Sequence, residues 1–228
     1  MFSANIGRMT EAQPAAENRL ERRKMRTRAA LIRAGQSFIA AGKTNVPVLE
    51  ITQAADVGMG SFYNHFESKE DLFEAAVNEV LDELGAVLDK LSDEGEDPAE
   101  TFARSFRLVG RLFRRRPETC KVLLNTGLTL ISAERGLAPR ALRDIRVGAR
   151  AGRFSVDDPV LALSVAGGAL MGLAQLLHDQ PERDDGEAAD RVTRDVLVMF
   201  GLPSHEADEI CGRPLPDLGE LTEPDSAA

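Results

Sequence analysis

The residues best suited to directional chemistry lie close together, in the stretch GMGSFYNHFESK between positions 58 and 69. It holds the chain's single Tyr, Tyr63, and one of its three His residues, His65. Hydroxyl, amide, imidazole and ammonium groups can form hydrogen bonds to base edges and to phosphate oxygens. Without regard to its surroundings, the pair Tyr63 and His65 could equally be an amphipathic cover on the surface of a domain.

Helices are expected before, within and after this stretch. Apolar residues at three- to four-residue steps predict a first helix that begins at Thr27 and is stopped by Gly42. A second helix follows Pro47 and ends at DVGMG, and a third spans residues 59–66. Two short helices joined by a tight turn have the layout of a helix-turn-helix unit. We expect Gly58 to adopt the positive φ that this turn needs.

The side chains of the third helix divide into two faces. Phe62 and Phe66, four residues apart, are expected to face the core. Ser68, with Asp71 three residues later, has the layout of a capping box and opens a fourth helix that runs to about Leu91.

Further helices are expected at about 98–116, 118–133, 138–151, 158–179 and 186–200, separated by Gly, Pro and acidic breaks. Strand-like alternation does not occur over any useful length, so the sequence predicts an all-α protein. The expected organisation is a flexible arm (1–17), a helix-turn-helix domain (18–68), a helical body (69–203) and an acidic tail (204–228).

Charge is unevenly distributed. The net charge is −9, yet residues 1–66 hold nine Lys and Arg against five Asp and Glu. The densest cluster, RLERRKMRTR, is either a solvated helix face paired with Glu17 and Glu21 or a surface for a polyanion. Because the rest of the chain is acidic, the basic part favours a nucleic acid as the partner of one end only.

Residues 160–177 contain no charged side chain. Eighteen such residues reach the lower limit for a membrane span. Ser164, Gln175 and three glycines, with acidic loops on both sides, favour a buried helix of a soluble, cytoplasmic protein instead. Cys120 and Cys211 fit no metal or redox spacing, and we expect reduced thiols and no metal or cofactor.

The N-terminal pattern resembles that of the TetR family of bacterial transcriptional regulators. The residues that carry the resemblance extend over about fifty positions: Phe38, Gly42, Ile51, Ala55, Val57, Tyr63, His65, Phe66, Lys69 and Leu72. Val46-Pro47 stand where the family usually has a Thr or Ser cap, and Met59 stands where a Lys is frequent. The resemblance implies a DNA-binding regulator, most simply a repressor.

A helix in the major groove presents small or polar groups, so Ser61, Tyr63 and Asn64 could reach base edges. The resemblance implies phosphate contacts for Tyr63, His65 and Lys69. The full set of expected DNA contacts is Arg26, Thr27, Arg28, Thr44, Met59, Gly60, Ser61, Tyr63, Asn64, His65 and Lys69.

The resemblance also implies a homodimer on palindromic double-stranded DNA and an effector pocket in the body. The expected dimer interface contains Gly168, Gly172, Val192, Val196 and Met199. The pocket would take a small hydrophobic or amphipathic ligand. Its candidate lining residues, each of which could also be ordinary core, are Phe102, Phe106, Phe113, Asn125, Thr129, Met171, Gln175 and His178.

Other classes of function are less well supported. The sequence contains no Ser-His-Asp or Cys-His set, no paired His ligands and no glycine-rich phosphate loop, so we do not expect an enzyme. A helical interaction protein whose basic arm meets RNA or anionic lipid remains an alternative, as does an activator without a small-molecule ligand. RNA binding would need stacking aromatics, and lipid binding would need bulky anchors on a basic helix.

Overall fold

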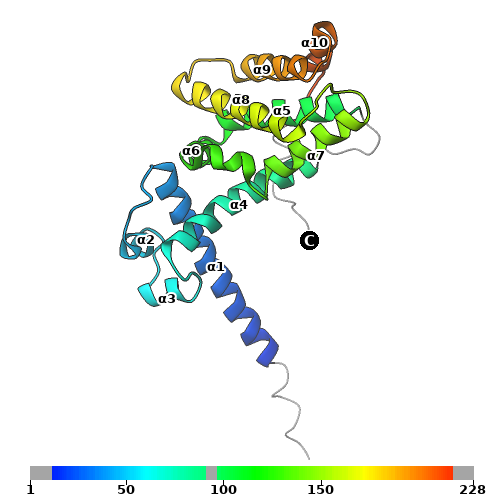
Figure 1. The fold of residues 1–228 in the computed structure, drawn as a ribbon. Helices are drawn as coiled ribbons and strands as arrows, with labels where there is room; N and C mark the ends of the chain where they lie inside the picture. The colour runs from blue at the N-terminus through cyan, green and yellow to red at the C-terminus, as the bar shows by residue number, and fades with distance from the viewer. Residues whose placement is uncertain (1–11, 91–96, 218–228) are drawn as a thin grey trace, which may run out of the picture. The chain divides into compact units, whose positions relative to one another are not determined.

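A computed structural model of the chain describes residues 12–90 and 97–217, and every regular element in these residues is helical (Figure 1). The all-α prediction is confirmed. The described chain divides into two compact units. Unit 1 contains residues 12–38 and 43–76, and unit 2 contains residues 39–42 together with the described residues from 77 onward. The expected boundary at residues 68–69 therefore lies inside unit 1, and the division falls within a helix.

Unit 1 contains most of α1 (Ala12–Ala40), α2 (Val48–Ala54), α3 (Met59–Tyr63) and the first part of α4 (Lys69–Asp89). Its buried apolar side chains come from all four helices: Leu31, Ile32, Ala34, Ile51, Phe62, Phe66, Leu72 and Ala76. Helices α1 and α4 approach closely within this unit, because a Cβ on Gly35 would lie 3.3 Å from the Cβ of Ala76. The side chain of Gln36 also donates to the carbonyl of Ala76.

Helix α1 begins well before the predicted start at Thr27. Residues 19–26 are exposed, with an ion pair between Lys24 and Glu21 on their surface. This segment has good helix formers but no apolar face, so a criterion based on apolar periodicity does not detect it. Of the arm expected at 1–17, residues 12–17 are helical, and residues 1–11 lie outside the described part of the chain.

Unit 2 contains the rest of α4, then α5 (Pro98–Arg115), α6 (Pro117–Thr126), a 3-10 helix η1 (Gly127–Ser132), α7 (Leu137–Arg150), α8 (Pro159–Asp179), α9 (Asp185–Met199) and α10 (Ser204–Gly212). Helix α5 packs against α7, α8, α9 and α10. Its contact with α9 is close, since a Cβ on Gly110 would lie 2.7 Å from the Cβ of Ala189. Two aromatic side chains of α5 join two from elsewhere in unit 2, and the contacting ring centroids are 5.0–6.1 Å apart: Phe102 and Phe106 with Phe154 and Phe200.

A buried ion-pair network ties α5 to α9. Arg107 is 5% exposed, and its Nε donates to Oδ1 of Asp190 at 2.7 Å. Arg111 donates to Oδ2 of the same carboxylate at 2.9 Å. Arg107 also donates to the carbonyl of Arg213, which follows α10.

The end of the chain corrects one expectation. Residues 204–212 form α10 instead of the start of a tail, and the helix buries Ala207, Ile210 and Cys211 against the core of unit 2. Its short apolar pattern lies between prolines in an acidic region, which hides it in the sequence. The last eleven residues, 218–228, lie outside the described part of the chain.

Candidate functional site

The turn between α2 and α3 is built differently from the sequence expectation. Gly58 has φ −72° and precedes α3 in an extended conformation, so the expected positive φ at Gly58 is wrong. The left-handed residue is Asp56, with φ 54°. The amide of Val57 donates to the carbonyl of Thr52 and that of Asp56 to Gln53, which is a Schellman ending of α2. Asp adopts the left-handed region more readily than most residues. The turn therefore does not need a glycine at this position, and the sequence does not mark it.

Helix α3 presents one buried face and one exposed face. Phe62 is fully buried and Phe66 is 3% exposed, whereas Tyr63 is 60% exposed. The rings of Phe62 and Tyr63 meet edge to face with centroids 5.2 Å apart. The core contact of Phe62 therefore fixes the base of the Tyr63 ring while its hydroxyl end is left on the surface.

The approach to the start of α3 is open. A Cβ added to Gly58 or Gly60 would meet nothing within 4 Å. Met59, 41% exposed, lies between them, and Asn64 is also exposed. Ser61 and His65 are half-buried. The described residues of unit 1 thus leave open space beside the backbone at Gly58 and Gly60.

The start of α4 completes this surface. Ser68 accepts a hydrogen bond from the amide of Asp71, and the carboxylate of Asp71 accepts one from the amide of Glu67. The bond to Ser68 is the one that the capping-box layout predicts, whereas Asp71 reaches the amide of Glu67 instead of that of Ser68. Together the two bonds fix the entry to α4. Lys69 follows at the first turn, and its Nζ donates to Oδ1 of Asn45 at 3.1 Å.

Basic side chains from α1 flank the same unit. The guanidinium of Arg28 lies over the Phe66 ring, 5.5 Å from the centroid. Arg26 is exposed, Thr27 is half-buried in the middle of α1 instead of at its start, and Thr44 is exposed on the loop before α2. We call the set Gly60, Ser61, Tyr63, Asn64, His65 and Lys69, whose members are exposed or half-buried, the reading surface.

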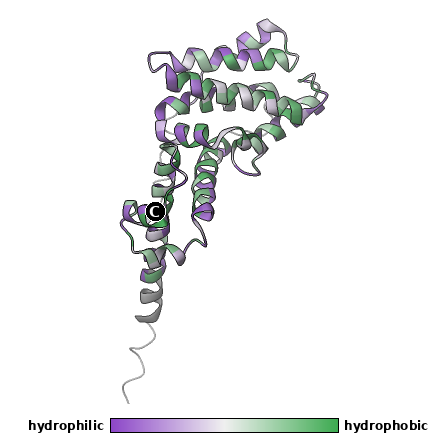
Figure 2. Ribbon diagram, turned by 60° about the vertical axis from the view of Figure 1, so that its left-hand side comes forward, coloured by the Kyte–Doolittle hydropathy of each residue, from purple (hydrophilic) through white to green (hydrophobic). Residues whose placement is uncertain are grey.

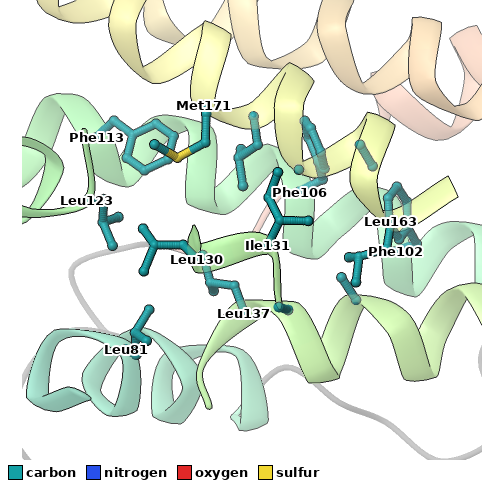
Figure 3. Close-up of a pocket in the computed structure, with 15 residues that line it drawn as sticks. Leu81, Phe102, Phe106, Phe113, Leu123, Leu130, Ile131, Leu137, Leu163 and Met171 are labelled. Carbon is teal, nitrogen blue, oxygen red and sulfur yellow. The ribbon is translucent and has the colours of Figure 1, made fainter. Parts of the chain in front are cut away.

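Unit 2 contains an apolar cavity of about 80 Å³ (Figure 3). Four of the expected lining residues do line it: Phe102, Phe106, Phe113 and Met171. Figure 3 shows Met171 and Phe113 at one end, with Phe102 and Leu163 at the other. The other lining residues were not among the expected ones. They are apolar and come from several helices: Leu81, Leu123, Leu130, Ile131, Leu137, Ala138, Ala141, Leu163, Ala166, Gly167 and Leu170.

The four polar candidates lie outside this cavity. Asn125 is exposed and donates to the carbonyls of Ile39 and Ala40. Thr129 donates to the carbonyl of Thr126, the last residue of α6. Gln175 pairs with Asp179, and His178 is exposed at the end of α8.

Helix α8 also has an apolar face that nothing in the described chain covers. Val160, Leu161 and Val165 are 54%, 62% and 46% exposed, and a Cβ on Gly168 or Gly172 would meet nothing within 4 Å. Figure 2 shows α8 in green and white over most of its length. Its length and mean hydropathy of 1.9 would suit a membrane span, but one helix of this kind is also found in the cores of soluble proteins.

The other expected interface residues lie on α9. Met199 is 44% exposed, while Val192 is half-buried. Val196 is 5% exposed and belongs to the core of its own unit, so it has little surface to offer a second chain.

Residues 31–76 match the profile of bacterial regulatory proteins of the tetR family, and residues 97–213 match that of the tetracyclin repressor-like C-terminal domain. The chain belongs to the TetR family. The first match contains α2, α3 and the start of α4, and the second runs from α5 through α10. The membership explains why the reading surface and the apolar cavity occur in one chain.

Among solved structures, the chain is similar to RolR. It is 32% identical to RolR without ligand, with a TM-score of 0.64. This match covers 83% of this chain and 98% of RolR. RolR in complex with resorcinol is 31% identical, with a TM-score of 0.59, and the match covers 87% of this chain and 99% of RolR.

Two curated relatives match over shorter stretches. The transcriptional regulator TcmR of Streptomyces glaucescens is 31% identical over 101 residues, which is 44% of either protein. The transcriptional repressor DhaR of Mycobacterium sp. (strain GP1) is 36% identical over 63 residues, 28% of this chain and 32% of DhaR. The chain thus spans less than half the length of these two relatives.

Proposed function

We propose that the chain is a cytoplasmic repressor that binds a palindromic DNA site through α3 and leaves it when a small ligand fills the cavity of unit 2. The observation that carries this proposal is the division of α3 into a buried Phe62 and an exposed Tyr63, beside an open backbone at Gly60. Such a helix can enter the major groove while its other face stays in the core.

Each part of the reading surface has a distinct task in this proposal. Ser61 and Asn64 hydrogen-bond to base edges, and Tyr63 offers its ring to thymine methyls and its hydroxyl to the backbone. Lys69 and His65 contact phosphates. Arg26 and Arg28 extend the contact along the phosphate backbone from α1, with Thr27 and Thr44 as further hydroxyl donors.

One reading surface contacts few bases, so we propose a homodimer that presents two copies to a symmetric site. The uncovered face of α8 supports the dimer, because Leu161 and Val165 are largely exposed in a single chain. Gly168 and Gly172 on the same helix leave room for a second helix to approach. Met199 of α9 is exposed as well.

The ligand in this proposal is small and largely apolar, because the cavity is lined by apolar side chains. The complex of RolR with resorcinol supports an aromatic ligand. A ligand that binds the DNA-free conformation more tightly shifts the population toward it and releases the DNA.

The DNA-binding part is tested with DNA from upstream of the protein's own gene. Fluorescence anisotropy should give an affinity that falls steeply as salt rises, because bound phosphates release counterions. We expect Tyr63→Ala and Lys69→Ala each to weaken binding at least about tenfold, about 1.4 kcal/mol. Lys121→Ala, which removes an exposed Lys paired with Glu118 on α6, is the control and should bind as the parent does. Parental affinity for both test variants would refute the assignment of α3.

The dimer is tested by Gly172→Leu. A Cβ at this position meets nothing within 4 Å among the described residues of its own chain, so the fold should tolerate the change, whereas a second helix on α8 would be displaced. Sedimentation should report a dimer for the parent and for Gly212→Leu, a control at another glycine with open space. An unchanged dimer of Gly172→Leu would place the interface elsewhere.

A further inference from the structure

The lining of the apolar cavity contains no polar side chain. A ligand held only there would leave any hydroxyl or charged group without a partner, which costs free energy on burial. Its volume of about 80 Å³ corresponds to roughly five to eight non-hydrogen atoms, each taken to be about the size of a water molecule. The cavity alone therefore suits the hydrocarbon part of a single ring.

A second, smaller cavity of about 40 Å³ adjoins the first. The two share five lining residues: Phe102, Phe106, Leu137, Ala141 and Leu170. The smaller cavity adds Ser105 from α5 and Asp144 from α7 to the lining. The two neighbouring cavities thus offer an apolar lining in the first and a polar end in the second.

The carboxylate at that end is unusual for its burial. Asp144 is 9% exposed, and its Oδ1 accepts a hydrogen bond from Nε of Arg143 at 3.0 Å. Burial raises the pKa of Asp144, and the opposing effect of Arg143 and Arg140 is too small to cancel it. A buried carboxylate in this state gains from an additional hydrogen-bond donor.

We propose that the effector is a small aromatic ring with a hydroxyl group, whose ring fills the apolar cavity and whose hydroxyl donates to Asp144. This inference rests on the proposed function, since it names the ligand class of the same cavity. A neutral hydroxyl supplies a further donor to Asp144 without bringing another charge into the apolar lining. An anionic ligand such as an aromatic carboxylate would instead be repelled by the carboxylate.

RolR, to which the chain is similar, has been solved in complex with resorcinol, an aromatic ring with hydroxyl groups. The sequence did not indicate this polar end. Asp144 lies in the strongly charged segment ALRDIRVGAR, where charged side chains are usually expected on the surface. Burial alone distinguishes Asp144 from its charged neighbours Arg143 and Arg146, which are exposed.

The experiment is calorimetric titration of the full chain, without DNA, with two ligands of the same shape. Resorcinol carries two hydroxyls on the ring, and m-xylene carries two methyl groups in their place. We expect resorcinol to bind and m-xylene to bind roughly tenfold more weakly or worse, as a lost hydrogen bond to a charged group predicts. Equal affinities, or tighter binding of m-xylene or of benzylamine, would overturn the proposal.

Asp144→Asn keeps the shape of the side chain and removes its charge. It should weaken resorcinol roughly tenfold while the affinity for m-xylene changes little. The matched control is Asp195→Asn, since Asp195 also accepts from a neighbouring Arg, Arg194, at 2.9 Å but lies on the exposed side of α9. Resorcinol affinity that is unaffected by Asp144→Asn, or equally reduced by Asp195→Asn, would refute the role of Asp144.

Failure of this inference is distinguishable from failure of the proposed function. If resorcinol binds through Asp144 but does not release the chain from its DNA, the ligand class holds and the regulatory proposal fails. If the chain binds DNA through Tyr63 and resorcinol does not bind at all, the ligand class fails and the DNA-binding proposal holds.

Discussion

The reading surface of unit 1 and the cavity of unit 2 are made in opposite ways. The reading surface comes from a short run of consecutive residues, with Phe62 buried and its neighbour Tyr63 exposed. The cavity is assembled from separate helices, with lining residues from Leu81 to Met171. A local surface depends on one turn and one small core, whereas a shared cavity depends on the packing of a whole unit.

This contrast predicts that two adjacent residues have different roles: Phe62 stabilises the fold, and Tyr63 contacts DNA. Phe62→Ala empties a fully buried aromatic site and should lower the free energy of unfolding by about 4 kcal/mol. Tyr63→Ala removes a side chain that is 60% exposed and should cost less than about 1 kcal/mol. Chemical denaturation of both variants is the measurement, and similar losses would abolish the contrast.

In unit 2, an ion pair between the buried Arg107 and the half-buried Asp190 stabilises the packing of α5 against α9, in addition to the aromatic cluster. Asp190→Asn leaves the buried Arg107 without its anionic partner and should cost about 3 kcal/mol. Asp195→Asn, in an exposed pair, should change stability by less than about 1 kcal/mol. Equal effects in denaturation would show that burial of the pair contributes nothing.

The same pair gives a pH dependence. Burial alone would raise the pKa of Asp190, but the hydrogen bonds from Arg111 and Arg107 outweigh it and lower the pKa below 3.8. The stabilisation is therefore fully present above the unfolded pKa and is lost as pH falls through the lowered folded value. Thermal unfolding followed from pH 6 downward should show a smaller acid-induced loss in Asp190→Asn than in the parent.

Gly60 tests whether the open space before α3 belongs to DNA. Gly60→Ala adds a methyl group that meets nothing within 4 Å, and it should stabilise the helix by about 0.5–1 kcal/mol. The same methyl should weaken DNA binding roughly tenfold, about 1.4 kcal/mol, if DNA approaches the backbone there. Anisotropy at fixed salt gives the affinity, and unchanged binding would remove Gly60 from the reading surface.

The smallest expected effect concerns the turn that orients α3. Asp56 has φ 54°, so Asp56→Gly should relieve strain and raise stability by about 0.5–1 kcal/mol. Gly42→Ala, at φ 69° after α1, is the opposite control and should lower it by about 1 kcal/mol. Denaturation midpoints would contradict this account of the turn if both changes had the same sign.

The same difference in construction decides what the sequence could predict. Phe62, Tyr63 and the cap at Ser68 follow local patterns, and the structure places them as expected. Four cavity residues were anticipated from their apolar type, but Leu81 and Leu130 were not, because only the fold brings their helices together. Asn125 and Gln175 were expected in the cavity because they are polar, but they form hydrogen bonds away from it.

Footprinting on the DNA upstream of the protein's own gene tests the central claim most directly. We predict two protected half-sites related by two-fold symmetry, with centres separated by about 10 base pairs or a multiple of it. Tyr63→Ala should erase the protection at the same protein concentration. Protection that lacks symmetry and persists in Tyr63→Ala would contradict sequence-specific binding through α3.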